Sequence, residues 1–148
     1  MRNGKPVTAA ETTLLLLDTH VLIWLMNGDE SIFMRKHSSV IGKASKTGNL
    51  RVSAISVWEI GMLEAKGRIK LTKSCLDWIK EALSAPGISL VPLTPEIAIE
   101  SSRLPGDFYG DPADRIVVAT SRILGAKLVT SDQKIIDYAR DHHVLVVK

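Results

Sequence analysis

Short apolar runs alternate with longer amphipathic stretches along most of the chain. The run at 14–17 consists of leucine alone, and such an uninterrupted apolar run is typical of a strand buried on both faces of a parallel sheet. The pattern predicts further short strands at Leu50–Ser53, Ile88–Val91, Lys127–Val129 and 144–147.

The stretches between these strands have the length and the apolar period of helices. In the stretch 72–83, for example, Asp77, Lys80 and Glu81 lie opposite an apolar face. Turn signals such as Pro86-Gly87 mark where helices end. We expect helices at about 20–26, 31–46, 55–66, 72–83, 95–103, 112–124 and 132–140.

The regular alternation of strands and helices predicts an α/β fold, a three-layer α/β/α sandwich around a small, mostly parallel central sheet. In this interpretation residues 14–148 form a single domain. Residues 1–13 are polar and patternless, so we expect a disordered extension there.

Composition narrows the class of protein. A chain of 148 residues has the size of one ordinary domain and can bury a real core. The single cysteine, Cys75, excludes an internal disulfide and fits a reducing compartment.

The apolar stretch 14–26 is interrupted by Asp18 and His20 and is too short to span a bilayer. We therefore expect a cytoplasmic protein without a membrane segment. A net charge of +3, with basic residues spread along the chain, only mildly favours a phosphate-bearing partner.

Acidic residues recur where a predicted strand meets a helix or a helix begins; they are Asp18, Glu59, Asp114 and Asp132. The carboxyl ends of parallel strands line one edge of a sheet, and ligands bind there. Carboxylates collected at that edge repel one another, and a divalent cation relieves the repulsion. Hard oxygen ligands favour Mg²⁺ or Mn²⁺ over zinc, and such ions suit phosphodiester hydrolysis.

Each of these acids also has a purely structural interpretation. Asp18 and Asp132 are at positions where a side chain can cap a helix. Glu59 completes a capping-box pattern with Ser56. Asp114 follows Asp111-Pro112 in a first helical turn, where a carboxylate favours the helix dipole. The residue chemistry alone therefore suggests an acidic metal site and leaves the capping alternative open.

The local strings around the four acids resemble those of the PIN-domain ribonucleases, and in particular the VapC-type toxins of toxin–antitoxin systems. The resemblance is carried by Leu-Leu-Leu-Asp18-Thr-His-Val-Leu-Ile-Trp24, Val52-Ser-Ala-Ile-Ser-Val-Trp-Glu59-Ile, Gly110-Asp-Pro-Ala-Asp114-Arg115-Ile and Leu128-Val-Thr-Ser-Asp132. The four strings occur in the family's order and cover nearly the whole chain from 14 to 147.

The resemblance implies roles for individual residues. It implies that Asp18 is the first metal ligand, that Asp114 is its main partner, and that Glu59 and Asp132 complete the catalytic pocket directly or through water. The segment ahead of 14 departs from the family pattern, in which the chain often begins almost at the first strand.

Further residues near these acids have smaller expected roles. Thr19, Thr130 and Ser131 are candidates to place hydroxyls near a phosphate or to hold a ligand. Arg115 is a candidate substrate contact, although pairing with a carboxylate within the fold is the favoured interpretation. Asp111 is a lesser candidate for the acidic pocket, and a role as helix cap is the favoured interpretation.

The resemblance further implies an activity and partners. It implies a Mg²⁺- or Mn²⁺-dependent endoribonuclease that acts on RNA such as tRNA, a homodimer, and an antitoxin whose tail covers the acidic pocket. The alternative is a PIN scaffold that binds RNA or a protein without turnover. A dehalogenase-like phosphatase is disfavoured because it needs Asp-x-Asp after the first strand, where this chain has Asp18-Thr-His20. A receiver domain is disfavoured because its upstream acidic pair is absent, and no phosphate-binding glycine loop occurs.

Aromatic and histidine residues have weaker interpretations. Trp24, Trp58 and Trp78 have helical core spacing, which favours packing or interface roles over base stacking. Phe108 and Tyr109 lie in a Pro/Gly loop beside Asp114 and are the better candidates for contact with RNA or antitoxin. The remaining expectations are structural: a helix-terminal role for His20, exposed positions for His142 and His143, and a core position for Cys75.

Overall fold

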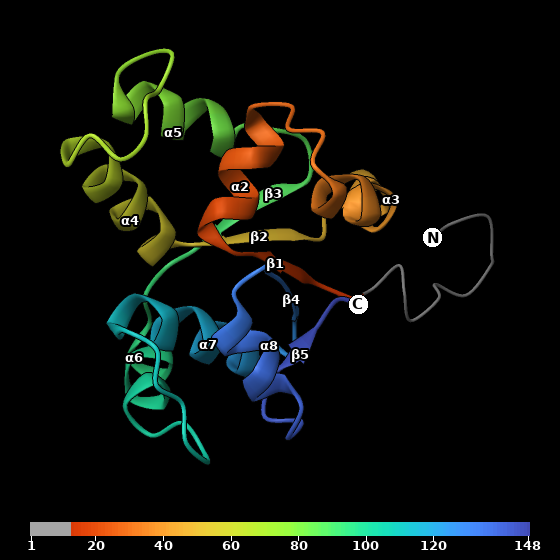
Figure 1. Cartoon of the computed structure of the whole chain (residues 1–148), viewed down its shortest axis with the longest axis vertical. Coiled ribbons are helices and arrows are strands. Elements are labelled where there is room, and N and C mark those ends of the chain that lie inside the picture. Colours follow the sequence, from red (N-terminus) through yellow and green to blue (C-terminus); the bar gives the residue numbers. More distant parts are fainter. Residues whose placement is uncertain (1–12) are drawn as a thin grey trace.

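The computed structural model describes residues 13–148, so most of the extension expected at 1–13 lies outside the described residues. The described chain contains a central sheet with helices on both faces (Figure 1). The strands are β1 (Leu15–Leu17), β2 (Leu50–Ser53), β3 (Ile88–Val91), β4 (Lys127–Val129) and β5 (Leu145–Val146). They lie in the order β3-β2-β1-β4-β5, and every pairing is parallel. The expected α/β fold with a small parallel sheet is confirmed.

Two helical layers cover the sheet (Figure 1). The first layer contains α2 (Thr19–Met26), α3 (Ile32–Lys46), α4 (Ala54–Ala65) and α5 (Cys75–Leu83). The second layer contains α6 (Pro95–Ser102), α7 (Pro112–Leu124) and α8 (Gln133–Ala139). The chain therefore completes one layer almost entirely before it builds the other, and β1 at the centre of the sheet contacts both.

Each layer has its own hydrophobic core, and β1 shows why. Leu15 and Leu17 face the first layer, whereas Leu16 faces the second, because successive side chains of a strand point to opposite faces. All three leucines are buried, as the uninterrupted apolar run predicts. On the first side the strand packs against residues such as Ile60 of α4, and on the second against Val118 of α7.

The largest departures from the expected helix starts and caps concern α5 and α4. The helix expected from 72 begins at Cys75 with Ser74 as its cap. Helix α4 is capped by Ser53, whose hydroxyl accepts from Ile55 N. The Ser56–Glu59 capping box is therefore wrong, since both residues lie inside α4. Helix α8 begins at Gln133 and is capped by Asp132, as the capping interpretation of that acid predicts.

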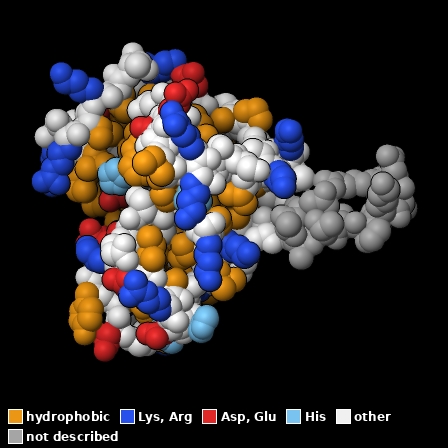
Figure 2. Space-filling view, turned by 45° about the vertical axis from the view of Figure 1, so that its right-hand side comes forward, with side chains coloured by type: hydrophobic (Ala, Val, Ile, Leu, Met, Phe, Trp, Pro, Cys, Tyr) orange, Lys and Arg blue, Asp and Glu red, His pale blue; other side chains and the backbone are white. Residues whose placement is uncertain are grey.

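Figure 2 shows how charge is distributed on one face of the molecule. Lysine and arginine side chains are spread over it, as expected from their spread along the sequence. Acidic side chains border a hollow at the left edge of this view, on the side where the strands end in Figure 1. No helix in the described range 13–148 is long and apolar enough to cross a membrane.

Candidate active site

Asp18 directly follows β1 and lies at the carboxyl edge of the sheet. Its Oδ1 atom accepts a hydrogen bond from Thr19 N at 2.9 Å, which confirms its role as the cap of α2. Its Oδ2 atom accepts a bond from Thr130 Oγ1 at 2.6 Å. Burial raises the pKa of Asp18, and the bonds from Thr130 and Thr19 oppose that rise. The two hydrogen bonds thus fix the position of the carboxylate, while its burial disfavours the charged form.

Thr130 follows β4, the neighbour of β1, and links two of the acids. Its buried hydroxyl donates to Asp18 and accepts a hydrogen bond from Asp132 N at 3.0 Å. Both acids are held because parallel β1 and β4 end at the same edge of the sheet. The structure thus places Thr130 as a residue that orients candidate ligands. Ser131 is exposed and makes no side-chain hydrogen bond within 13–148.

Asp114 approaches this edge from α7. It lies in the first helical turn, where Asp111 caps the helix and accepts a hydrogen bond from Asp114 N at 2.9 Å. The side chain of Asp114 is 17% exposed. Burial, together with the charges of Asp111, Asp132 and Asp18, raises the pKa of Asp114 to about 6. The structure therefore brings Asp18, Asp114 and Asp132 within electrostatic reach of one another.

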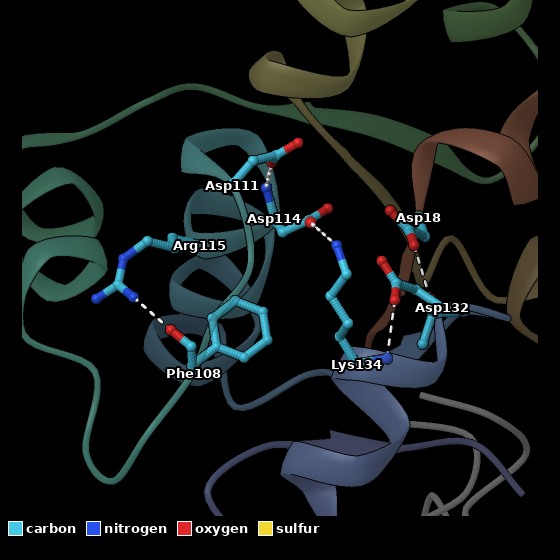
Figure 3. Close-up of polar contacts among 8 residues, drawn as sticks. Asp18, Phe108, Asp111, Asp114, Arg115, Asp132 and Lys134 are labelled. Carbon is cyan, nitrogen blue, oxygen red and sulfur yellow. Dashed lines mark hydrogen bonds and ion pairs between the residues drawn. The ribbon is translucent and has the colours of Figure 1, made fainter.

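A lysine that sequence reasoning did not single out also faces these acids. Lys134, in the first turn of α8, places its Nζ atom 3.9 Å from Asp114 Oδ2. Its backbone N–H donates to Asp132 Oδ1 at 2.9 Å. Figure 3 shows its ammonium directed toward Asp114 on one side, with Asp18 and Asp132 on the other side, above the start of α8 in this view. In the sequence, only its position two residues after Asp132 connects Lys134 with the acids. A single lysine at such a position belongs to no recognisable motif, so the sequence did not indicate it.

Glu59 is the one predicted acid that is not linked to the other three by charge or by a shared hydrogen-bond partner. It lies in α4, half-buried, and its carboxylate makes no hydrogen bond or ion pair with any described residue. The charges that act on Asp18 and Asp114 do not include Glu59. One turn earlier in α4, Ser56 accepts a hydrogen bond from Thr19 Oγ1 at 2.8 Å, and this bond links α4 to α2. Because Thr19 is fully buried, its hydroxyl is suited to joining α2 and α4 and not to contacting a substrate.

Arg115 is a structural clamp. Its guanidinium donates from Nε to Ser101 O at 2.9 Å. One terminal nitrogen donates to Phe108 O, also at 2.9 Å (Figure 3). The expected pairing within the fold is therefore made to backbone carbonyls and not to a carboxylate. The clamp holds the loop ahead of α7, in which the ring of Phe108 lies close to Gly110 and Asp114.

The aromatic expectations met mixed outcomes. Phe108 is buried against Tyr138, with ring centroids 5.0 Å apart, so the expectation of an exposed contact residue is wrong for it. Tyr109 is 85% exposed and stays a candidate contact. Trp78 is a core residue, but Trp58 is 56% exposed, so its helical spacing did not report burial. The expectation of exposure holds for His142, whereas His143 is half-buried beside Tyr138. Cys75 is half-buried at the margin of the first core.

The donor set fits a hard divalent cation. No three acidic, histidine or cysteine side chains among residues 13–148 already converge as a closed ligand cage. Mg²⁺ does not need one, since it is usually bound through one or two carboxylates and keeps several waters. Asp18 and Asp114 are oxygen donors whose raised pKa values reflect burial and like charge, and a cation relieves both. This chemistry favours Mg²⁺ or Mn²⁺ over thiophilic metals.

Comparison with known families defines the class. The family model described as PIN domain matches residues 15–141. The chain therefore belongs to the PIN domain family, as the four acidic strings indicated.

One relative narrows the class further. Ribonuclease VapC22 of Mycobacterium tuberculosis is 32% identical to the chain over 134 residues, which is 90% of this chain and 98% of that protein. The chain is thus similar to a VapC-type member of the family over nearly its full length.

Solved toxin–antitoxin assemblies share the fold. The DNA-bound VapBC2 of Rickettsia felis matches with a TM-score of 0.62 at 14% identity, covering 91% of this chain and 98% of that chain. The DNA-bound VapBC of Salmonella typhimurium matches with a TM-score of 0.63 at 13% identity, over 92% and 98% of the two chains. A toxin–antitoxin complex from Klebsiella pneumoniae matches with a TM-score of 0.59 at 21% identity, over 90% and 96%. At such identities the likeness concerns the fold alone.

Proposed function

We propose that this protein is a metal-dependent endoribonuclease and the toxin of a VapC-type toxin–antitoxin pair. The observation that carries the proposal is the grouping of Asp18, Asp114 and Asp132 at the carboxyl edge of the sheet. Its similarity to Ribonuclease VapC22 supports RNA as the substrate class. The proposed reaction is hydrolysis of an RNA phosphodiester bond.

In this proposal the residues of the site have separate roles in binding the metal and in positioning its ligands. Asp18 and Asp114 would hold the Mg²⁺ or Mn²⁺ ion, and Asp132 and Glu59 would complete the acidic pocket directly or through water. A divalent ion bound there supplies charge that polarises the phosphate and lowers the pKa of the attacking water. Thr130 orients the Asp18 carboxylate, and Arg115 fixes the loop beside Asp114.

The proposed partners follow from the relatives. The three solved assemblies are named as VapBC or toxin–antitoxin complexes, which supports an antitoxin as the protein partner of this chain. Tyr109, exposed beside the acidic loop, is the side chain we propose for contact with RNA or antitoxin. A homodimer, tRNA as the target and a cytoplasmic location are kept as predictions.

The test is cleavage of RNA by purified protein free of antitoxin. With Mg²⁺ or Mn²⁺ we expect cleavage that EDTA stops and that Asp18→Asn or Asp114→Asn lowers by roughly 10²-fold or more, as removal of a metal ligand should. The matched control is Asp141→Asn, an exposed aspartate near the end of the chain, which should cleave like the wild type. Metal and RNA binding without cleavage would favour the non-catalytic PIN scaffold instead.

A further inference from the structure

Lys134 differs from the other exposed lysines in what it faces. The charged groups that act on Asp114 are Asp18, Asp111, Asp132 and Lys134, so the lysine is the one cation among them. It reaches across from α8, which Asp132 caps, to α7, which carries Asp114 (Figure 3).

The contact to Asp114 is loose. At 3.9 Å the ammonium and the carboxylate attract by charge and do not form a hydrogen bond. The lysine side chain is 61% exposed, and exposed pairs of this kind contribute little to stability. The ammonium can therefore leave Asp114 at little cost when another cation neutralises the carboxylate.

An ammonium released at the rim of this acidic pocket is suited to bind a phosphate group of the RNA. The pocket itself repels an RNA phosphate, because its carboxylates carry the same sign of charge. A flexible lysine supplies three N–H donors and a compact positive charge, which suits a phosphate oxygen. Lys134 lies where such a contact would hold the phosphate against the acids that act on it.

We propose that Lys134 is a positioning residue that exchanges partners: its ammonium balances Asp114 before a divalent ion binds, and it holds an RNA phosphate afterwards. The inference rests on the proposed function, because it needs RNA as the substrate. It makes two separable predictions, one for metal binding without RNA and one for RNA binding.

The first measurement is the affinity of the full chain for Mn²⁺ by calorimetry. Lys134→Met removes a positive charge that competes with the ion for Asp114. We expect Mn²⁺ to bind roughly 3- to 10-fold more tightly to this variant, a coupling of ordinary size for one neighbouring charge. Lys36→Met is the matched control, since Lys36 is an exposed helical lysine that makes no ion pair within 13–148. It should leave the Mn²⁺ affinity unchanged.

The second measurement is the salt dependence of binding to a fluorescein-labelled RNA oligonucleotide of random sequence, followed by anisotropy with Mn²⁺ present. Its linkages are phosphorothioates, which keep the backbone charge and resist hydrolysis by the wild type. Loss of one phosphate contact should lower the slope of log affinity against log salt by about 0.7 for single-stranded RNA. We expect that decrease for Lys134→Met, a wild-type slope for Lys134→Arg, and no change for Lys36→Met.

The outcomes separate the two proposals. An unchanged salt slope in Lys134→Met, or weaker Mn²⁺ binding, overturns the role of Lys134 while the wild type still binds and cleaves RNA. Failure of the wild type itself to bind RNA overturns the proposed function and this inference with it. Because Lys134 is largely exposed, its variants should fold, and their circular dichroism spectra check that they do.

Discussion

At the scale of single residues, Asp114 is the group on which burial and neighbouring charge act together. Its pKa of about 6 lies above the ordinary value of 3.8, so the folded chain keeps this proton over a pH range in which the unfolded chain has lost it. The stabilisation linked to that proton is complete below about 3.8 and is lost as the pH rises through about 6. At neutral pH, without metal, the Asp114 carboxylate therefore destabilises the fold.

Asp114→Asn should remove this destabilisation of the fold by the carboxylate. In EDTA at about pH 7.5 we expect the variant to be more stable than the wild type by roughly 1–3 kcal/mol, the upper figure being the full shift at about 1.36 kcal/mol per pKa unit. At about pH 3 the difference should nearly vanish, because Asp114 is then protonated in both the folded and the unfolded wild type. Urea unfolding at both pH values measures it, with Asp141→Asn as the control. A variant less stable than the wild type at the higher pH would contradict this account.

At the scale of elements, the loop ahead of α7 determines where Asp114 lies. An added Cβ at Gly110 would come within 2.5 Å of Phe108 Cε1 and 2.8 Å of Asp114 Cβ. Glycine is therefore required here for close approach, because the ring of Phe108 occupies the space that a side chain would need. Arg115 holds the carbonyl of Phe108, so ring, glycine and acid form one packed unit.

Gly110→Ala should disturb this unit. We expect it to lower the free energy of unfolding by about 1–3 kcal/mol, as overpacking does, and to weaken Mn²⁺ binding because Asp114 shifts. The matched control is Gly61→Ala within α4, where an added Cβ meets nothing within 4 Å. That change should stabilise the chain by about 0.5–1 kcal/mol through helix propensity. Equal effects of the two substitutions on urea unfolding would show that crowding at Gly110 is not decisive.

The elements themselves were largely predictable, because their signals are local. The leucine run at 14–17 indicated β1, and Asp111-Pro112 marked the start of α7. The cap of α4 was missed. Ser53 and Ser56 both offer a capping hydroxyl, and Ser53 is the cap because it is the last residue of β2, a strand end that the sequence had indicated.

Which side chains of the site are buried could not be predicted from the sequence, because burial depends on tertiary packing. The loop composition around Phe108 suggested exposure, but its ring has Tyr138 of another element as a partner. Lys134 was missed for the same reason, since its charge matters only because α8 lies beside the first turn of α7. The four acids could be proposed from the sequence because their spacing relative to strands and helices is itself a local pattern. That Glu59 is not among the charges acting on Asp18 and Asp114 could not be predicted from such a pattern.

At the scale of the whole molecule, the candidate site connects parts that the chain builds separately. Asp18 ends the central strand, Asp114 begins a helix of the second layer, and Asp132 follows β4. Thr130 is the hydrogen-bonded link between two of them, whereas Asp114 is tied in only through the weak ion pair with Lys134. A cation shared by Asp18 and Asp114 would join the central strand to the second layer.

A ligand that binds only the folded state stabilises it, by about 2.7 kcal/mol at a concentration one hundred times its dissociation constant. We therefore expect saturating Mn²⁺ to raise the melting temperature of the wild type by roughly 5–10 °C, using about 2–4 °C per kcal/mol for a domain of this size. Differential scanning fluorimetry with Mn²⁺ and with EDTA measures the shift.

The variants locate the ion by the size of this shift, because each substitution also changes the melting temperature without metal. Asp18→Asn and Asp114→Asn should lose most of the shift, and Asp141→Asn should keep it. Glu59→Gln should keep a larger part than Asp18→Asn, because the Glu59 carboxylate is not among the charges that act on Asp18 and Asp114. A full shift in Asp18→Asn would place the ion elsewhere on the protein, whereas a complete loss in Glu59→Gln would mean that α4 moves toward the sheet edge when the ion binds.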